Sequence, residues 1–146
     1  MFKFLKRLVR KEANKNLDTS NYKTKIKNFS LEHDQIVGVN IDDVIIKIPY
    51  IDIVRISIMV YGEDLLPQPI WTVQTIKDII DIPNELNNTD KLFFEVLNKK
   101  LDGYNSIQTQ EEILKAMNCT HNSLFHIWQR HDADKIFKSE PVNNFV

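Results

Sequence analysis

One stretch, residues 51–61, constrains the fold of this chain more than any other. Its sequence, IDIVRISIMVY, is dense in β-branched residues, which favour a strand over a helix. Successive side chains of a strand point to opposite faces, so the stretch sorts into two sets. These sets are Ile51, Ile53, Arg55 and Ser57 on one face and Asp52, Val54, Ile56, Ile58 and Val60 on the other. We therefore expect a strand here, and a sheet built around it.

Shorter segments on both sides of this stretch have the same period of two. Upstream, we expect strands around Ile26 and residues 29–31, at 36–39 and at 44–48, with a turn at 40–43. Downstream, strands at 70–75 and 77–82 would meet at a tight corner, and Pro83 would close the sheet region. Two prolines in 62–69 prevent regular pairing there. The connections are too short for crossover helices, so the predicted sheet is antiparallel.

Helical patterns follow the sheet region. The expected helices are 90–101, begun by Asn88 or Thr89 and ended by Gly103, and 111–117, begun by a capping box of Thr109 and Glu112. Residues 123–130 are a third candidate segment, with Leu124, Phe125 and Trp128 facing inward. The predicted class is α+β, with an antiparallel β-sheet or partly open barrel closed by C-terminal helices. Trp71 and Trp128 are expected to anchor the core.

The charge is divided unevenly along the chain, although the net charge is only −1. Residues 1–27 carry nine Lys or Arg and two acidic residues, a net of +7, whereas residues 28–146 have a net of −8. We expect a basic arm and linker at 1–23, a single domain at 24–130 and a tail at 131–146. The domain would attract a cationic partner, and the arm an anionic surface.

The first eleven residues, MFKFLKRLVRK, alternate apolar and basic residues at helical spacing. A short basic amphipathic helix of this kind can lie on an anionic membrane surface. The candidate membrane contacts are Phe2, Lys3, Lys6, Arg7 and Arg10. The alternative is that the apolar stripe packs on the domain or frays. The stretch lacks the continuous apolar run of a signal peptide, and the single cysteine, Cys119, is compatible with a reducing compartment.

Potential catalytic and metal-binding residues do not form a recognisable pattern. His121, His126 and His131 are five residues apart, so on one helix they would not converge on an ion. We interpret Cys119, close to His121, as a structural residue. Adjacent acidic residues of a strand point to opposite faces, and no phosphate-binding or nucleophile motif is present. We therefore expect neither an enzyme nor a bound metal or cofactor, and the acidic body argues against nucleic-acid binding.

A set of spaced motifs resembles a family of small bacterial proteins. The motifs are Tyr50-Ile51-Asp52-Ile53…Ile56, Ile70-Trp71, Ile82-Pro83, a Leu- and Phe-rich helix, and Ile113…Ala116-Met117…Thr120…Asn122…Phe125…Trp128. Proteins of this family have a pleckstrin-homology-like fold and are often encoded near polymorphic or contact-dependent toxins. The resemblance covers residues 36–130. Two features depart from it: Tyr50 replaces a more usual tryptophan, and residues 102–105 only loosely replace a Pro-Gly-Phe-Asp turn.

The resemblance implies an immunity-type protein that binds and neutralises a cognate toxin domain in interbacterial competition. A nuclease toxin has a basic active surface, which an acidic inhibitor would complement. The candidate partner-binding residues are Asp42, Asp43, Glu63, Asp64, Asp78 and Asp81. The alternative for these charges is that they only keep the domain soluble. The alternative for the whole protein is a membrane-surface adaptor anchored by its arm. We expect a cytoplasmic protein, peripheral at the inner membrane in this second interpretation.

Overall fold

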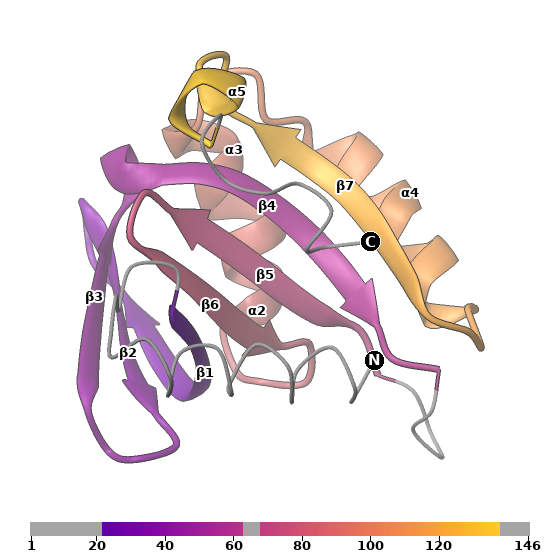
Figure 1. Cartoon of the computed structure of the whole chain (residues 1–146), viewed down its shortest axis with the longest axis horizontal. Coiled ribbons are helices and arrows are strands. Elements are labelled where there is room, and N and C mark those ends of the chain that lie inside the picture. Colours follow the sequence, from indigo (N-terminus) through magenta and orange to yellow (C-terminus); the bar gives the residue numbers. More distant parts are fainter. Residues whose placement is uncertain (1–21, 63–67, 138–146) are drawn as a thin grey trace.

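The computed structural model describes residues 22–62 and 68–137, which form a seven-stranded sheet with the helical segments of residues 89–117 on one face (Figure 1). The strands are β1 (Tyr22–Leu31), β2 (Gln35–Asn40), β3 (Ile45–Pro49), β4 (Ile53–Val60), β5 (Ile70–Thr75), β6 (Asp78–Pro83) and β7 (Ser123–Gln129). The helical segments are η1 (Tyr50–Asp52), α2 (Thr89–Lys91), η2 (Leu92–Val96), α3 (Leu97–Lys100), α4 (Ser106–Met117) and α5 (Ala133–Ile136). The predicted α+β class is therefore confirmed.

The strands lie in the order β3-β2-β1-β6-β5-β4-β7. Strand β1 joins two halves of this sheet, because residues 22–25 pair with β6 and the part after a bulge at 26–28 pairs with β2. The β1–β6 pairing is parallel, and each other neighbouring pair of described strands is antiparallel. The expectation of a wholly antiparallel sheet is wrong at this one junction. Strands β3 and β7 form the two edges, so the sheet is open and not closed into a barrel.

The sequence predicted the helix after the sheet closely. Segments α2, η2 and α3 follow one another without a break over residues 89–100, against an expected helix at 90–101. Its first turn differs in detail, because the Asn88 amide donates to Phe29 O at 3.2 Å and does not cap the helix. Helix α4 begins earlier than expected. Its N-cap is Asn105, whose Oδ1 accepts from Ile107 N and Gln108 N, and Thr109 lies buried inside the helix.

The expected third helical segment is a strand. Residues 123–129 form β7, which pairs with β4 at the sheet edge. The helices α2 to α4 therefore precede the last strand of the sheet, and the expectation that C-terminal helices close the fold is wrong. Only the short α5 follows β7 within the described residues. The folded region also extends past the expected boundaries, because β1 begins at Tyr22 and α5 packs its Ala133 and the following Phe137 on Val54.

The core lies between the sheet and the helices, centred on Trp71. This side chain is fully buried and stacks on Phe93 with 3.8 Å between ring centroids, while its Nε1 donates to Asn84 Oδ1 at 2.8 Å. Around it pack Ile56, Ile58, Val73, Ile80, Ile82, Leu92 and Leu97. Trp128 is 9% exposed and joins the same cluster, so the prediction that both tryptophans anchor the core is confirmed. Truncation of a buried Trp to Ala typically costs about 3–5 kcal/mol.

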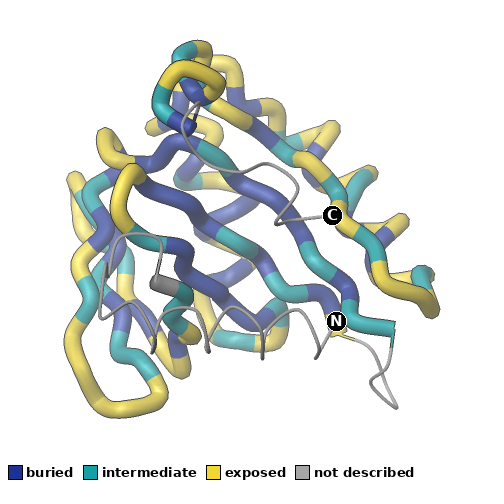
Figure 2. The backbone as a smooth tube through the Cα atoms, viewed as in Figure 1, coloured by how far each residue is buried: buried dark blue, intermediate teal, exposed yellow. Residues whose placement is uncertain are grey.

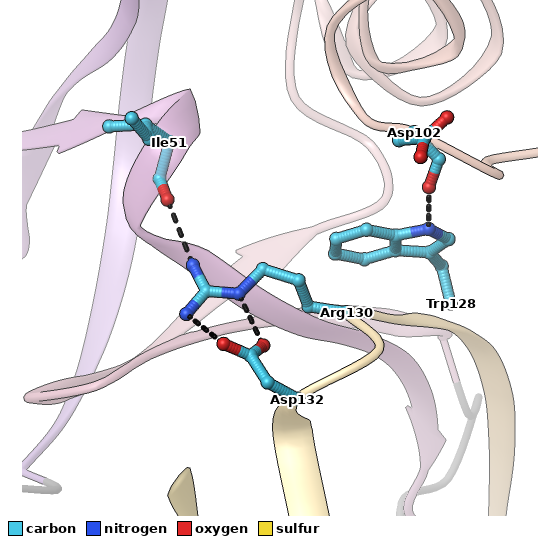
Figure 3. Close-up of polar contacts among 5 residues, drawn as sticks. All are labelled: Ile51, Asp102, Trp128, Arg130 and Asp132. Atoms are coloured by element: carbon cyan, nitrogen blue, oxygen red, sulfur yellow. Dashed lines mark hydrogen bonds and ion pairs between the residues drawn. The ribbon is translucent and has the colours of Figure 1, made fainter.

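Polar contacts hold the end of β7 against the rest of the domain (Figure 3). The indole Nε1 of Trp128 donates to Asp102 O at 2.8 Å. The guanidinium of Arg130 donates to Ile51 O at 3.1 Å and to both carboxylate oxygens of Asp132 at 2.6 and 3.2 Å. The hydrogen bonds from Arg130 hold the pKa of Asp132 below its usual value. These contacts connect β7 to η1 and to the residues before α4.

Candidate protein-binding surface

The connection between β2 and β3 is a tightly ordered turn, which we call the hairpin tip (residues 40–45). The side chain of Asn40 folds back on the turn, and its Oδ1 accepts from Asp42 N at 2.8 Å and from Val44 N at 3.0 Å. Backbone bonds close the same turn, from Asn40 N to Val44 O and from Asp43 N to Asn40 O. Asp43 adopts a left-handed conformation with φ 65°, which Asp tolerates better than most residues. The hairpin tip is thus fixed by local sequence.

The hairpin tip presents apolar and acidic side chains together. Ile41, Val44 and Ile45 are 61%, 51% and 63% exposed, and Asp42 and Asp43 are exposed between them. The turn lies at the lower left of the sheet, where the backbone is coloured as exposed (Figures 1 and 2). Asp43 forms an ion pair with Lys27 of β1. Exposed apolar side chains that cluster in this way are typical of protein-binding surfaces.

Among the predicted acidic residues that the structure describes, only Asp42 and Asp43 lie together and exposed. Asp42 and Asp43 lie at the hairpin tip, while Asp78 begins β6 and is half-buried opposite Tyr22. Asp81 is only 7% exposed, so its carboxylate is not displayed to a partner. Glu63 and Asp64 lie outside the described residues, as do the candidate membrane contacts at 1–11.

Asp81 belongs to a polar cluster on the face of the sheet away from the helices. Lys23 Nζ lies 3.3 Å from Asp81 Oδ2 and 2.9 Å from Tyr61 Oη, and Thr72 Oγ1 donates to Asp81 Oδ1 at 3.3 Å. Burial lowers the pKa of Lys23, but the Asp81 carboxylate and Tyr61 outweigh it and leave that pKa raised. Burial raises the pKa of Asp81, and Lys23 opposes this shift. The cluster ties β1 to β6 and is partly buried.

Cys119 lies in the turn between α4 and β7. Its Sγ is 3.0 Å from Ser123 Oγ, and the hydrogen bond from Ser123 lowers the pKa of the thiol, with a smaller effect from the His121 backbone. The ring nitrogens of His121 are each 3.8 Å from the sulfur. Cys119 is half-buried against the core, so its contacts also serve to hold this turn. Within residues 22–62 and 68–137, no group of three His, Cys, Asp or Glu side chains could hold a metal ion.

The sequence analysis selected only charged residues for the binding surface and therefore missed the apolar residues of the hairpin tip. Their signal is nevertheless present in the sequence, because Ile41 and Val44 flank the two acids inside a segment predicted to be a turn. Apolar residues in a turn have few ways to become buried. The tip also sits on the edge strand β3, which exposes Ile45.

Comparison of the chain with protein-family models, with curated proteins and with solved structures finds no match. Within the described part of the chain, no helix has the length and apolar character needed to cross a membrane.

Proposed function

We propose that this protein is a non-catalytic, immunity-type protein that binds and neutralises a cognate bacterial toxin domain through its hairpin tip. The observation that carries the proposal is the combination of rigidity and exposure at residues 40–45. The turn is held by Asn40, yet Ile41, Val44 and Ile45 remain more than half exposed. The family resemblance of the sequence supports the same function.

Rigidity favours binding because less conformational freedom is lost when the complex forms. The Asn40 contacts fix the backbone on both sides of Asp42, so the exposed side chains are already arranged before a partner arrives. The apolar side chains would supply the buried centre of an interface, and the acids its polar surroundings. A stoichiometric inhibitor needs this kind of surface and no catalytic group.

The charge of the tip favours a basic partner. Asp43 is paired with Lys27, and within the described residues no cation forms an ion pair with Asp42. The body from residue 28 onward has a net charge of −8, which would accelerate association with a cationic surface. A nuclease toxin domain fits this requirement, because its active surface must hold phosphate. The proposal includes a cytoplasmic location and the pleckstrin-homology-like assignment, both of which rest on the sequence.

The test is capture from the native cell with the full chain as bait. We expect the wild-type protein to recover one protein domain in a stoichiometric, salt-sensitive complex. That domain should arrest growth when expressed alone, and co-expression of the wild-type chain should restore growth. Asp42→Lys should weaken the complex by about tenfold or more, since it reverses a charge at the centre of the tip. Glu111→Lys is the matched control, because Glu111 is exposed on α4 and lies outside the tip.

Equal loss of affinity in both charge-reversal variants would show a general electrostatic effect and would contradict the role of the tip. Recovery of a partner that does not affect growth would contradict neutralisation. If no protein partner is recovered and the bait is found with the membrane fraction, the immunity interpretation is wrong. The adaptor interpretation, with contacts from residues 1–11, would then take its place.

A further inference from the structure

The two edges of the sheet differ in how they are protected. Edge strands expose unpaired backbone groups, and proteins commonly protect them with Lys, Pro, other charges or bulges. Edge strand β3, with the sequence IIKIP, carries Lys47 and Pro49 and leads out of the acidic tip. Edge strand β7, with the sequence SLFHIWQ, contains no proline and no Lys, Arg, Asp or Glu. The β7 edge is therefore the less protected of the two.

The accessible part of β7 is its first half. A register shift in the pairing with β4 places Ile127 as an extra residue, so regular pairing runs from Ser123 to His126. On its other side, β7 pairs with no strand among the described residues. Leu124 is 58% exposed on the face away from the helices. Burial and the neighbouring Arg55 lower the pKa of His126, which favours the neutral imidazole.

Helix α4 lies beside β7 on the helix-covered face of the sheet and extends this surface there. It runs alongside β7 in Figure 1, and both elements are largely exposed at this edge in Figure 2. The exposed residues of α4 include Ile107, Leu114 and Met117, which are 71%, 59% and 56% exposed. Position 107 lies two turns before position 114, and position 114 lies one turn before position 117, so the three form one stripe. We call β7 and this stripe the β7 rim.

We propose that the β7 rim is a self-association surface, at which two copies of the chain pair β7 with β7 in antiparallel fashion about a twofold axis. Charge points to a second copy as the occupant. The whole chain has a net charge of only −1, so two copies repel each other little, and β7 brings no charged side chain to the contact. In a twofold pairing each strand meets its own sequence, so a neutral strand is free of like-charge contacts. The α4 stripes of the two copies would add apolar area beside the paired strands.

The proposed dimer is independent of the toxin-binding role. Strand β7 and the hairpin tip are at opposite edges of the sheet, so pairing through β7 leaves both tips free. A dimer could form even if the tip binds nothing. Conversely, a monomer could still neutralise a toxin, so failure of either proposal can be recognised separately.

The test is sedimentation equilibrium of the full chain between about 1 and 100 μM, where a dimer shows a concentration-dependent mass. We expect the wild-type chain to dimerise and Leu124→Lys to weaken dimerisation at least tenfold, because it brings like charges close to the twofold axis. Ile45→Lys is the matched control, since Ile45 is 63% exposed on the opposite edge strand. It should dimerise as the wild type does. Leu114→Lys on α4 provides a second variant that does not alter the strand.

Circular dichroism should show native structure in each variant, because the altered side chains are mostly exposed. A wild-type chain that stays monomeric up to about 100 μM would overturn the proposal. So would a dimer that Leu124→Lys and Leu114→Lys leave intact, or one that only Ile45→Lys dissociates. If the isolated chain is monomeric and β7 is protected from hydrogen exchange only in a complex with another protein, the rim binds a foreign strand and the dimer is excluded.

Discussion

Tyr104 shows how one side chain fixes the junction between two helical segments. Its ring is buried, and its Oη donates to Phe93 O at 2.7 Å, so the chain leading into α4 is held against η2. Burial raises the pKa of the Tyr104 phenol, and a hydrogen bond with Thr109 opposes the shift only in part. The folded protein therefore favours the neutral phenol more strongly than the unfolded chain does. Tyr104 connects the local packing to the pH dependence of stability.

Tyr104→Phe should lower the free energy of unfolding at neutral pH by about 1 kcal/mol, through loss of the bond to Phe93 O. In the unfolded chain the phenol ionises near pH 10, whereas in the folded chain it ionises at higher pH. The wild-type contribution is thus present below about pH 10 and is lost as pH rises above that value. Urea unfolding at neutral and alkaline pH should show a steeper loss in the wild type than in Tyr104→Phe. Parallel losses would contradict this assignment.

At the scale of an element, the α4–β7 turn is defined by the close approach of two backbones. Gly62 N donates to Asn122 Oδ1 at 2.6 Å, and a Cβ added to Gly62 would lie 2.6 Å from His121 Cα. The end of β4 can therefore meet this turn only with glycine at position 62. Gly38 differs, because a Cβ there would meet the flexible end of the Ile26 side chain, with Cδ1 at 2.9 Å.

Gly62→Ala should destabilise the protein by about 1–3 kcal/mol, because backbone atoms have to move. Gly38→Ala is the matched control and should cost less, since Ile26 can change rotamer. Thermal unfolding of both variants measures the difference. Hydrogen exchange should locate the loss in Gly62→Ala at the pairing of β4 with β7. An equal effect of the two substitutions would show that the turn can shift to accept a side chain.

Strand β7 shows where the prediction from sequence failed. Phe125 and Trp128 both join the core although they are three residues apart, a spacing that indicates a helix and not a strand. The extra residue at the β7 register shift allows both to face the helices. Residues 53–60 were predicted correctly as a strand from their β-branched residues. The predicted faces are wrong at its start, because a bulge between Ile53 and Arg55 places Ile53 in the core with Ile56. A local pattern is informative where pairing is regular and misleads where a bulge changes its period.

At the scale of the whole molecule, the unpredicted feature is the parallel pairing of β1 with β6. Four strands separate these two along the sequence, so no local pattern records the contact. Asp81 illustrates the consequence for the candidate surface. It lies between two inward-facing isoleucines and must point to the other face, where β1 brings Lys23 within 3.3 Å. The turn at the hairpin tip was predictable because its acids and its Asn40 are neighbours in sequence.

The last prediction concerns the division of the chain into a basic arm and an acidic body. Residues 1–16 contain six Lys or Arg and one acid, and β1 begins only at Tyr22. Deleting residues 1–16 therefore removes much of the basic charge and none of the described elements. If the hairpin tip binds the partner, the shortened chain should keep its affinity within about twofold. Isothermal titration against the captured domain measures this.

The same deletion should abolish flotation of the protein with anionic phospholipid vesicles, an interaction that salt should also weaken in the full chain. Loss of vesicle binding with retained neutralisation would show that the basic arm and the acidic body make two different contacts. If the deletion instead reduces partner affinity more than tenfold while Asp42→Lys does not, the arm is the binding element. The acidic tip would then serve only solubility. A uniformly basic surface on the partner would attract the acidic tip and repel the cationic arm, so one such surface would not bind both.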